Sequence, residues 1–115
     1  MARARNIKPG FFENEELAEL PVEARLLFIG LWTLADREGR LEDRPKRVKM
    51  QLFPLDDIDA DDLLQQLADA GFIARYGECT RQARCKNQSE YIQILTFEKH
   101  QSPHCKEKAS TIPAP

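Results

Sequence analysis

The hydrophobic pattern is strongest between two turn signals in the first part of the chain, Pro21 and Gly39. Residues 26–32 are all large and apolar apart from one glycine, so a helix here would be apolar almost all the way round. Such a helix is typical of a buried element, and the run is shorter than the roughly 20 apolar residues that span a bilayer. Pro21 suits the first helical position, and Gly39 suits a left-handed stop. The pattern predicts a central core helix over residues 21–38.

Helical signals also occur on both sides of this stretch. Asn14 is a candidate N-cap followed by two glutamates, which predicts a short helix over about residues 14–20. A second helix begins at a proline and covers about residues 45–53, where two apolar residues four apart share one face. Asp59 is a candidate N-cap for a third helix over about residues 59–70, in which leucines and alanines recur at helical spacing.

Strand signals follow the third helix. Residues 72–76 and 91–97 are rich in β-forming side chains. Residues 77–89 between them are polar and have no apolar period, so the two strands are expected to form a hairpin with a long loop. Residues 40–43 allow only a brief strand, in which Leu41 is the candidate for the inward-facing position.

The order of these elements predicts the fold. Helix, short strand, helix, turn, helix, strand, loop, strand is the order of a winged helix-turn-helix, an α+β fold. We expect three main helices, a short N-terminal helix and a β-hairpin wing, with a generic α+β domain as the alternative. The predicted boundaries are a basic arm over 1–10, the domain over 11–98 and a polar tail or linker over 99–115. The expected core consists of Leu26, Phe28, Trp32, Val48, Leu52, Leu63, Leu67, Phe72 and Ile92.

Charge complicates this picture, because nucleic-acid-binding domains are usually basic overall. The chain carries 17 lysines and arginines against 19 aspartates and glutamates, for a formal net charge of -2. The charges are segregated, however. Basic residues gather in the arm, around the second helix and in the hairpin loop, whereas acidic residues gather in residues 13–23 and 56–62. The acidic blocks either cap helix starts or dock on basic patches of another copy or of a partner.

Three motifs carry a resemblance to a known family. In chain order they are FF-x-N-E-x-L, L-W-x-x-A-D-R-x-G and F-E-K-H-Q, and the similarity covers about residues 6–104. In this arrangement the chain resembles phage and prophage replication proteins with an N-terminal winged-helix domain of the replisome-organiser type, similar to the DnaD-like primosomal proteins. The resemblance implies DNA binding at an origin or fork and recruitment of a helicase or its loader. The stretch from Glu78 to Ser89 looks like an enlargement of the shorter wing of that family.

Candidate DNA contacts follow from where the cations lie. The third helix of a winged helix usually enters the major groove. Here its start is acidic and would repel phosphates, although Gln65 and Gln66 have the groups to read adenine. We therefore expect contacts from Arg44, Lys46, Arg47 and Lys49 at the second helix, Arg3, Arg5 and Lys8 in the arm, and Arg81, Arg84 and Lys86 in the wing. Binding should be weakly sequence-specific, with a salt slope near -4.5 if about five phosphates are neutralised. The alternatives are a protein-interaction module without DNA readout and a phage transcription regulator.

Other chemistry finds little support. The sequence contains no nucleophile elbow and no phosphate-cradling glycine loop, so we expect neither an enzyme nor a cofactor. The two cysteines of the hairpin loop are spaced more loosely than usual zinc pairs, so no metal is expected, although metal binding stays open for the set Cys79, Cys85, His100, His104 and Cys105.

The basic start is followed by no apolar segment, and three cysteines is an odd number, which together favour a cytoplasmic protein with reduced thiols.

Overall fold

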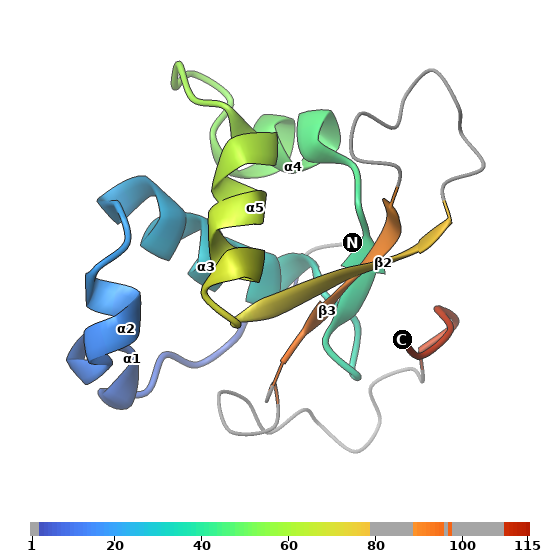
Figure 1. Ribbon diagram of the computed structural model, residues 1–115, viewed down its shortest axis with the longest axis horizontal. Coiled ribbons are helices and arrows are strands. Elements are labelled where there is room, and N and C mark those ends of the chain that lie inside the picture. The colour runs from blue at the N-terminus through green and yellow to red at the C-terminus, as the bar shows by residue number, and fades with distance from the viewer. Residues whose placement is uncertain (1–2, 79–88, 96, 98–109) are drawn as a thin grey trace.

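The computed structural model describes residues 3–78, 89–95, 97 and 110–115, and these form an α+β fold (Figure 1). The coarse fold class expected from the sequence is therefore confirmed. The elements in chain order are α1 (Gly10–Glu13), α2 (Glu15–Ala18), α3 (Val22–Leu34), β1 (Arg40–Glu42), α4 (Pro45–Leu52), α5 (Ala60–Asp69), β2 (Ile73–Glu78) and β3 (Ser89–Ile94). Among the described helices, none is long and apolar enough to cross a membrane.

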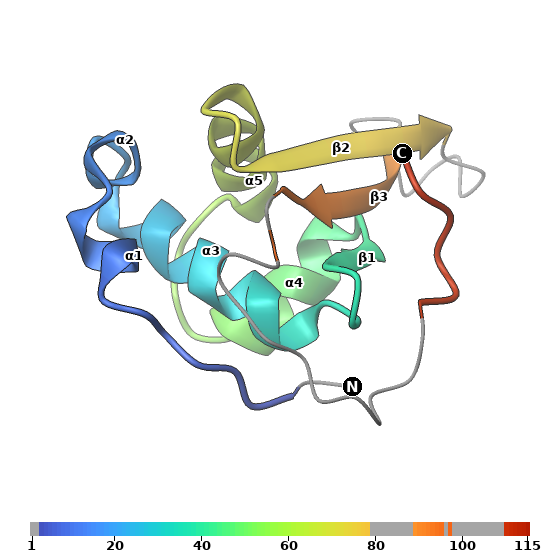
Figure 2. The ribbon, with the colours of Figure 1, turned by 90° about the horizontal axis from the view of Figure 1, so that it is seen from below.

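The three strands form one antiparallel sheet in the order β1-β3-β2. The predicted hairpin is confirmed, because β2 pairs with β3, and Tyr76 lies opposite Tyr91. The brief first strand adds to the other edge of β3, where Leu41 lies opposite Ile92. Figure 2 shows the strands at one side of the molecule and α1, α2 and α3 at the other. Since side chains alternate between faces along a strand, Leu41 and Ile92 share the inner face, which joins the helices in one core.

Helix α3 forms the centre of that core, as its apolar run predicts. Its buried residues include Leu27, Phe28, Leu31 and Trp32. Leu26, which was expected in the core, is instead 54% exposed, so that prediction is wrong. Leu26 lies one helical turn after Val22, which is also exposed, whereas the next residue, Leu27, is buried. An apolar run thus predicts a core helix without showing which of its residues remains outside.

The helix is also shorter than predicted. It ends at Leu34, and the chain then turns into β1. The Asp36 carboxylate makes this turn by accepting hydrogen bonds from the backbone N–H groups of Glu38 and Arg40, at 2.9 and 3.0 Å. Gly39 is in the left-handed region, with φ of 77°, but it serves this turn and not the helix end. A side chain in an Asx-type turn therefore stops the helix four residues before the predicted end.

The predicted short N-terminal helix corresponds to α2, and a further short helix that was not predicted, α1, precedes it. Asn14 is extended, with ψ of 109°, so it ends α1 and begins α2. Its side chain accepts a hydrogen bond from the N–H of Leu17, which confirms the predicted N-cap. In α1, Phe11 is buried against α3, whereas Phe12 is 68% exposed.

Gly30 lets α4 approach α3 closely. A methyl group added at Gly30 would lie 2.5 Å from Cδ1 of Leu52. A larger residue at this position would therefore displace the Leu52 side chain or force the two helices apart. Leu52 and Phe72 pack against the core while only partly buried, whereas Val48, Leu63, Leu67 and Ile92 are buried as predicted.

Candidate nucleic-acid interface

The start of α4 presents two cations to solvent. Pro45 occupies the first turn, and Val48 anchors the helix to the core. Lys46 and Arg47 lie on the opposite side of the helix and are exposed. Within the described part of the chain, no hydrogen bond or ion pair holds either side chain. These two groups are therefore available to phosphate oxygens.

The other two predicted cations of this region are engaged within the molecule. The Lys49 ammonium donates to the backbone carbonyl of Phe53 at 3.3 Å, across the C-terminus of α4. Arg44 forms an ion pair with Glu42, with 2.6 Å between Nε and Oε2. Lys49 remains partly exposed and can reach outward by releasing one carbonyl, whereas Arg44 already has a carboxylate partner. The α4 surface that we define as basic thus consists of Lys46, Arg47 and Lys49.

The arm cations stabilise the end of α3. The last carbonyls of a helix have no partner inside it and carry partial negative charge. Arg5 donates to the carbonyls of Trp32 and Ala35 at 3.0 and 3.1 Å, and Arg3 donates to Ala35 at 3.3 Å. The Arg5 guanidinium also lies 5.3 Å from the centre of the Phe97 ring. The arm is therefore anchored at these two arginines rather than loosely docked, while Lys8 is exposed.

The glutamines of α5 are hydrogen-bonded along their own helix. The Gln65 amide donates to Asp69 at 2.9 Å, and the Gln66 amide donates to Asp62 at 2.8 Å. To read a base edge, each amide would have to leave its carboxylate partner. The Asp59 side chain accepts from the N–H of Asp62, which confirms the predicted N-cap of this helix. The start of α5 is therefore built for capping and is lined with acids.

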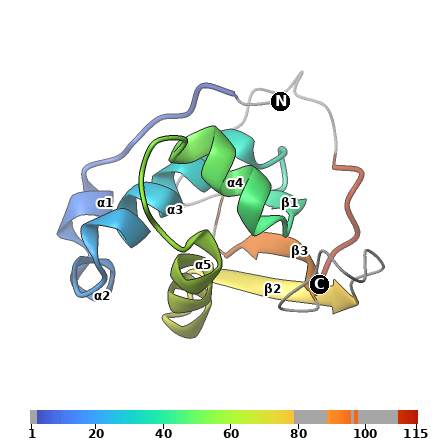
Figure 3. The ribbon, with the colours of Figure 1, turned by 90° about the horizontal axis from the view of Figure 1, so that it is seen from above.

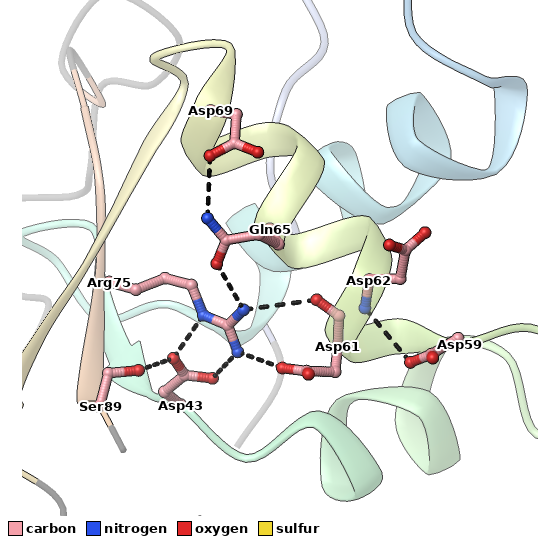
Figure 4. A network of polar contacts seen from close by, with 8 residues as sticks. All are labelled: Asp43, Asp59, Asp61, Asp62, Gln65, Asp69, Arg75 and Ser89. Atoms are coloured by element: carbon pink, nitrogen blue, oxygen red, sulfur yellow. Dashed lines mark hydrogen bonds and ion pairs between the residues drawn. The ribbon is translucent and has the colours of Figure 1, made fainter. Parts of the chain in front are cut away.

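A buried arginine that sequence reasoning missed, Arg75, binds Asp43 and Asp61 (Figure 4). Arg75 of β2 binds both carboxylate oxygens of Asp43, with Nε and Nη2 at 2.7 and 2.9 Å. Its Nη2 also donates to Asp61 of α5 at 2.6 Å. The Ser89 hydroxyl of β3 donates to the same Asp43 carboxylate. The side chains of Arg75 and Asp43 are 6% and 0% exposed, so this pair is buried, whereas Asp61 at its edge is 32% exposed.

A sequence signal for Arg75 did exist. Ile73 and Arg75 are two residues apart in a strand, so they share a face, and an isoleucine on the inner face indicates that the arginine points inward too. A buried charge needs a partner, which predicts an acid near it. The identity of that acid does not follow from the sequence, because Asp43 and Asp61 are distant along the chain.

The network leaves the two helices with opposite surface charge. One guanidinium faces the two carboxylates of Asp43 and Asp61, so it cannot neutralise the remaining acids at the start of α5. Asp59 and Asp62 are exposed there. The basic surface of α4 and the acidic start of α5 are therefore adjacent elements of opposite sign, since these two helices pack on each other.

Some predicted site residues lie outside the described residues. These are the wing cations Arg81, Arg84 and Lys86 and the metal-ligand candidates Cys79, Cys85, His100, His104 and Cys105. Among the residues that are described, no group of three histidine, cysteine, aspartate or glutamate side chains could hold a metal ion.

Comparison of the chain with models of protein families, with curated proteins and with solved structures gave no match.

Proposed function

We propose that this chain is a winged-helix domain of a phage-type replication protein that binds DNA through α4 and recruits a helicase or its loader. The order of helices and strands supports the winged-helix assignment, as does a sheet in which the hairpin strands β2 and β3 add to the short strand β1. The three sequence motifs that resemble replisome-organiser proteins support the role in replication.

The observation that carries the DNA-binding part is the basic surface of α4. Lys46 and Arg47 are exposed, with no partner among the described residues. Lys49 can contact a phosphate beside them if it breaks its hydrogen bond to the Phe53 carbonyl. Phosphate contacts supply most sequence-independent affinity, while base contacts supply specificity. Because the glutamines of α5 are engaged and its start is acidic, contact through α4 should give weak, largely non-specific binding.

Fluorescence anisotropy with labelled double- and single-stranded DNA tests this proposal. Three cations at phosphates predict that log K falls with log salt at a slope of about -2.7. The slope near -4.5 expected from the sequence assumed about five phosphate contacts. In the structure Arg44 is paired with Glu42, and Arg3 and Arg5 bind carbonyls at the end of α3, so fewer cations are available. Replacing Lys46, Arg47 and Lys49 with alanine should abolish the salt-dependent binding.

The control for this experiment lies on the same helix. Gln51 is exposed on α4 and uncharged, so Gln51→Ala removes a side chain of similar length without changing charge. It should leave the affinity and the salt slope unchanged. A wild-type chain that binds neither form of DNA, or a triple variant that binds as well as wild type, would contradict the proposal.

A second candidate function, a protein-interaction module, is favoured by two exposed apolar side chains near the start of α3. Val22 and Leu26 lie one helical turn apart and are 63% and 54% exposed, and Glu23 is exposed beside them. Apolar side chains that are exposed together are typical of contact surfaces with another copy or a partner protein. Light scattering at low and high salt tests self-association. A concentration-dependent mass that Leu26→Ser reduces to the monomer, together with no DNA binding, would favour this function.

A further inference from the structure

The last six residues of the chain lie beside the strands, at the opposite end of the molecule from α1 and α2 (Figure 3). Hydrogen bonds with other described residues hold this segment, Ser110–Pro115, which we call the C-terminal segment. The Ser110 hydroxyl donates to the Asp36 carboxylate. Arg40 donates to the carbonyl of Ile112 at 3.2 Å, and the Tyr76 hydroxyl donates to the carbonyl of Pro113 at 2.6 Å. These contacts hold residues 110–113 against the body of the molecule, while Ala114 and Pro115 are exposed.

The contacting groups belong to the outer face of the sheet. Leu41 and Ile73 point inward. By strand alternation Arg40, the residue before Leu41, and Tyr76, three residues after Ile73, therefore point outward. Tyr91 lies opposite Tyr76 in the register, and their ring centres are 5.7 Å apart. All three strands therefore contribute to this face, since Arg40 is on β1, Tyr91 on β3 and Tyr76 on β2.

The donors and acceptors are fixed before the segment arrives. The Arg40 guanidinium donates through Nε to the Gln93 side chain at 2.8 Å, which leaves Nη1 directed at Ile112. One oxygen of the Asp36 carboxylate accepts the N–H groups of the turn, so the other is presented to Ser110. A site whose groups are held by their own neighbours loses little side-chain freedom on binding.

The chemistry matches a short proline-containing peptide that bends at Ile112, where the Ser110 hydroxyl accepts a hydrogen bond from the Ile112 N–H at 3.2 Å. The face offers hydrogen-bond donors to two consecutive carbonyls, those of Ile112 and Pro113. Pro113 and Pro115 have no N–H group and a fixed φ, so the segment needs few acceptors from the face and is stiff before it binds. Proline-containing segments commonly dock on aromatic side chains for these reasons.

We propose that the outer face of the sheet is a binding site for short proline-containing peptides, occupied here by the chain's own C-terminal segment. A partner peptide of the same chemistry would displace that segment. This inference is independent of DNA binding through α4, because it uses different residues on a different face.

The first test removes one donor from the full-length chain. Tyr76→Phe deletes the hydroxyl that binds Pro113, and its matched control, Tyr91→Phe, deletes the neighbouring hydroxyl, for which the described residues show no bond to the segment. Heteronuclear NOEs of the Thr111, Ile112 and Ala114 amides should resemble those of the core in wild type and in Tyr91→Phe, and fall toward zero in Tyr76→Phe. Equal NOEs in all three proteins would overturn the proposal.

The second test adds the peptide in trans. A labelled peptide Ser-Thr-Ile-Pro-Ala-Pro should bind the wild-type chain weakly, because the resident segment competes. Ser110→Ala weakens the binding of the chain's own C-terminal segment and does not change the face that binds it. The same peptide should therefore bind this variant about two- to tenfold more tightly, the range expected for one hydrogen bond. In both proteins the bound peptide should shift the Thr111 and Ile112 amides toward their positions in Tyr76→Phe.

A scrambled peptide and oligo(dT) complete the experiment. Neither should displace the segment. If the Ser-Thr-Ile-Pro-Ala-Pro peptide fails to bind Ser110→Ala, the proposal is overturned. It is also overturned if oligo(dT) displaces the segment and the peptide does not, since the face would then be a nucleic-acid surface. Loss of DNA binding on changing α4 would not affect either result, so the two proposals fail separately.

Discussion

At the scale of single residues, Arg75 connects two helices whose exposed surfaces have opposite charge. It joins β2 to Asp43, which precedes α4, and to Asp61 in the first turn of α5. Each of these acids would repel phosphate if it were exposed and unpaired. The arginine turns them into a structural connection instead, which fixes the basic start of α4 beside the acidic start of α5.

We predict that Arg75→Met destabilises the fold strongly. It leaves the buried Asp43 carboxylate without its bidentate partner, and breaking a buried pair costs about 3–5 kcal/mol. Urea denaturation followed by circular dichroism measures this change. Adding Asp43→Asn should recover part of the loss, because the unpaired charge is then removed. A single variant as stable as wild type would show that the pair contributes nothing.

Tyr76 gives a second prediction at this scale, which concerns its ionisation. Burial raises the pKa of its phenol above the ordinary 10.0, Arg40 opposes the shift, and Asp36 and Tyr91 add to it. The neutral hydroxyl donates to Pro113, and the phenolate cannot. Because the folded pKa is raised, the stabilising contribution is complete below pH 10.0 and is lost as the pH rises through the folded pKa.

An absorbance titration of the phenolate band checks this expectation. The difference between wild type and Tyr76→Phe isolates the one phenol, and its midpoint should lie above 10.0. A midpoint at or below that value would contradict the burial of this hydroxyl.

At the scale of elements, glycines in turns explain where helices and strands begin. Gly39 and Gly71 both have positive φ, 77° and 86°. A methyl group at Gly39 would also lie 2.7 Å from Cβ of Phe97, whereas one at Gly71 would meet nothing within 4 Å. Comparing alanine substitutions at these two glycines therefore separates the cost of backbone strain, which both share, from the cost of steric crowding, which only Gly39 has.

We predict that Gly39→Ala is more destabilising than Gly71→Ala. Both alanines are strained in the left-handed region, which costs about 1–2 kcal/mol. The added crowding at Phe97 should cost Gly39→Ala about a further 1–3 kcal/mol. Thermal and urea denaturation of both variants measure the difference. Equal stabilities would mean that the turn before β1 shifts to admit the methyl group.

At the scale of the whole molecule, the N-terminal arm has a structural role. Arg5 reaches across from the start of the chain to the last carbonyls of α3 and to Phe97, which follows β3. It therefore joins the two ends of the domain. This use of the guanidinium competes with the DNA contact that the sequence suggests for it.

Arg5→Ala distinguishes the two roles. Hydrogen bonds from a charged donor contribute about 1.5–3 kcal/mol, so the variant should lower the free energy of unfolding by that order. The salt slope of DNA binding should stay unchanged, because α4 carries the contacts. Lys8→Ala is the control, since Lys8 is exposed and basic in the same arm. If Arg5→Ala changed the salt slope of DNA binding and left the free energy of unfolding unchanged, Arg5 would be a DNA contact and not a structural residue.

The sequence alone determined which elements form and in what order. Apolar spacing, proline and N-cap residues act over a few positions, so the starts of the helices at Val22, Pro45 and Ala60 and the pairing of β2 with β3 were predicted correctly, whereas the end of α3 was not. The same local signals indicated the basic character of α4. They could not place Leu26 outside the core, because exposure depends on which elements cover each side of a helix.

Only the tertiary structure decided how the charged groups are used. The partners of Arg75, Arg5 and Arg40 lie many residues away along the chain, and a cation is available to a ligand only if no such partner holds it. The sequence could therefore count cations but could not separate Lys46 and Arg47 from those bound inside. The contact between the C-terminal segment and the sheet was hidden for the same reason, because it joins residues that become neighbours only after folding.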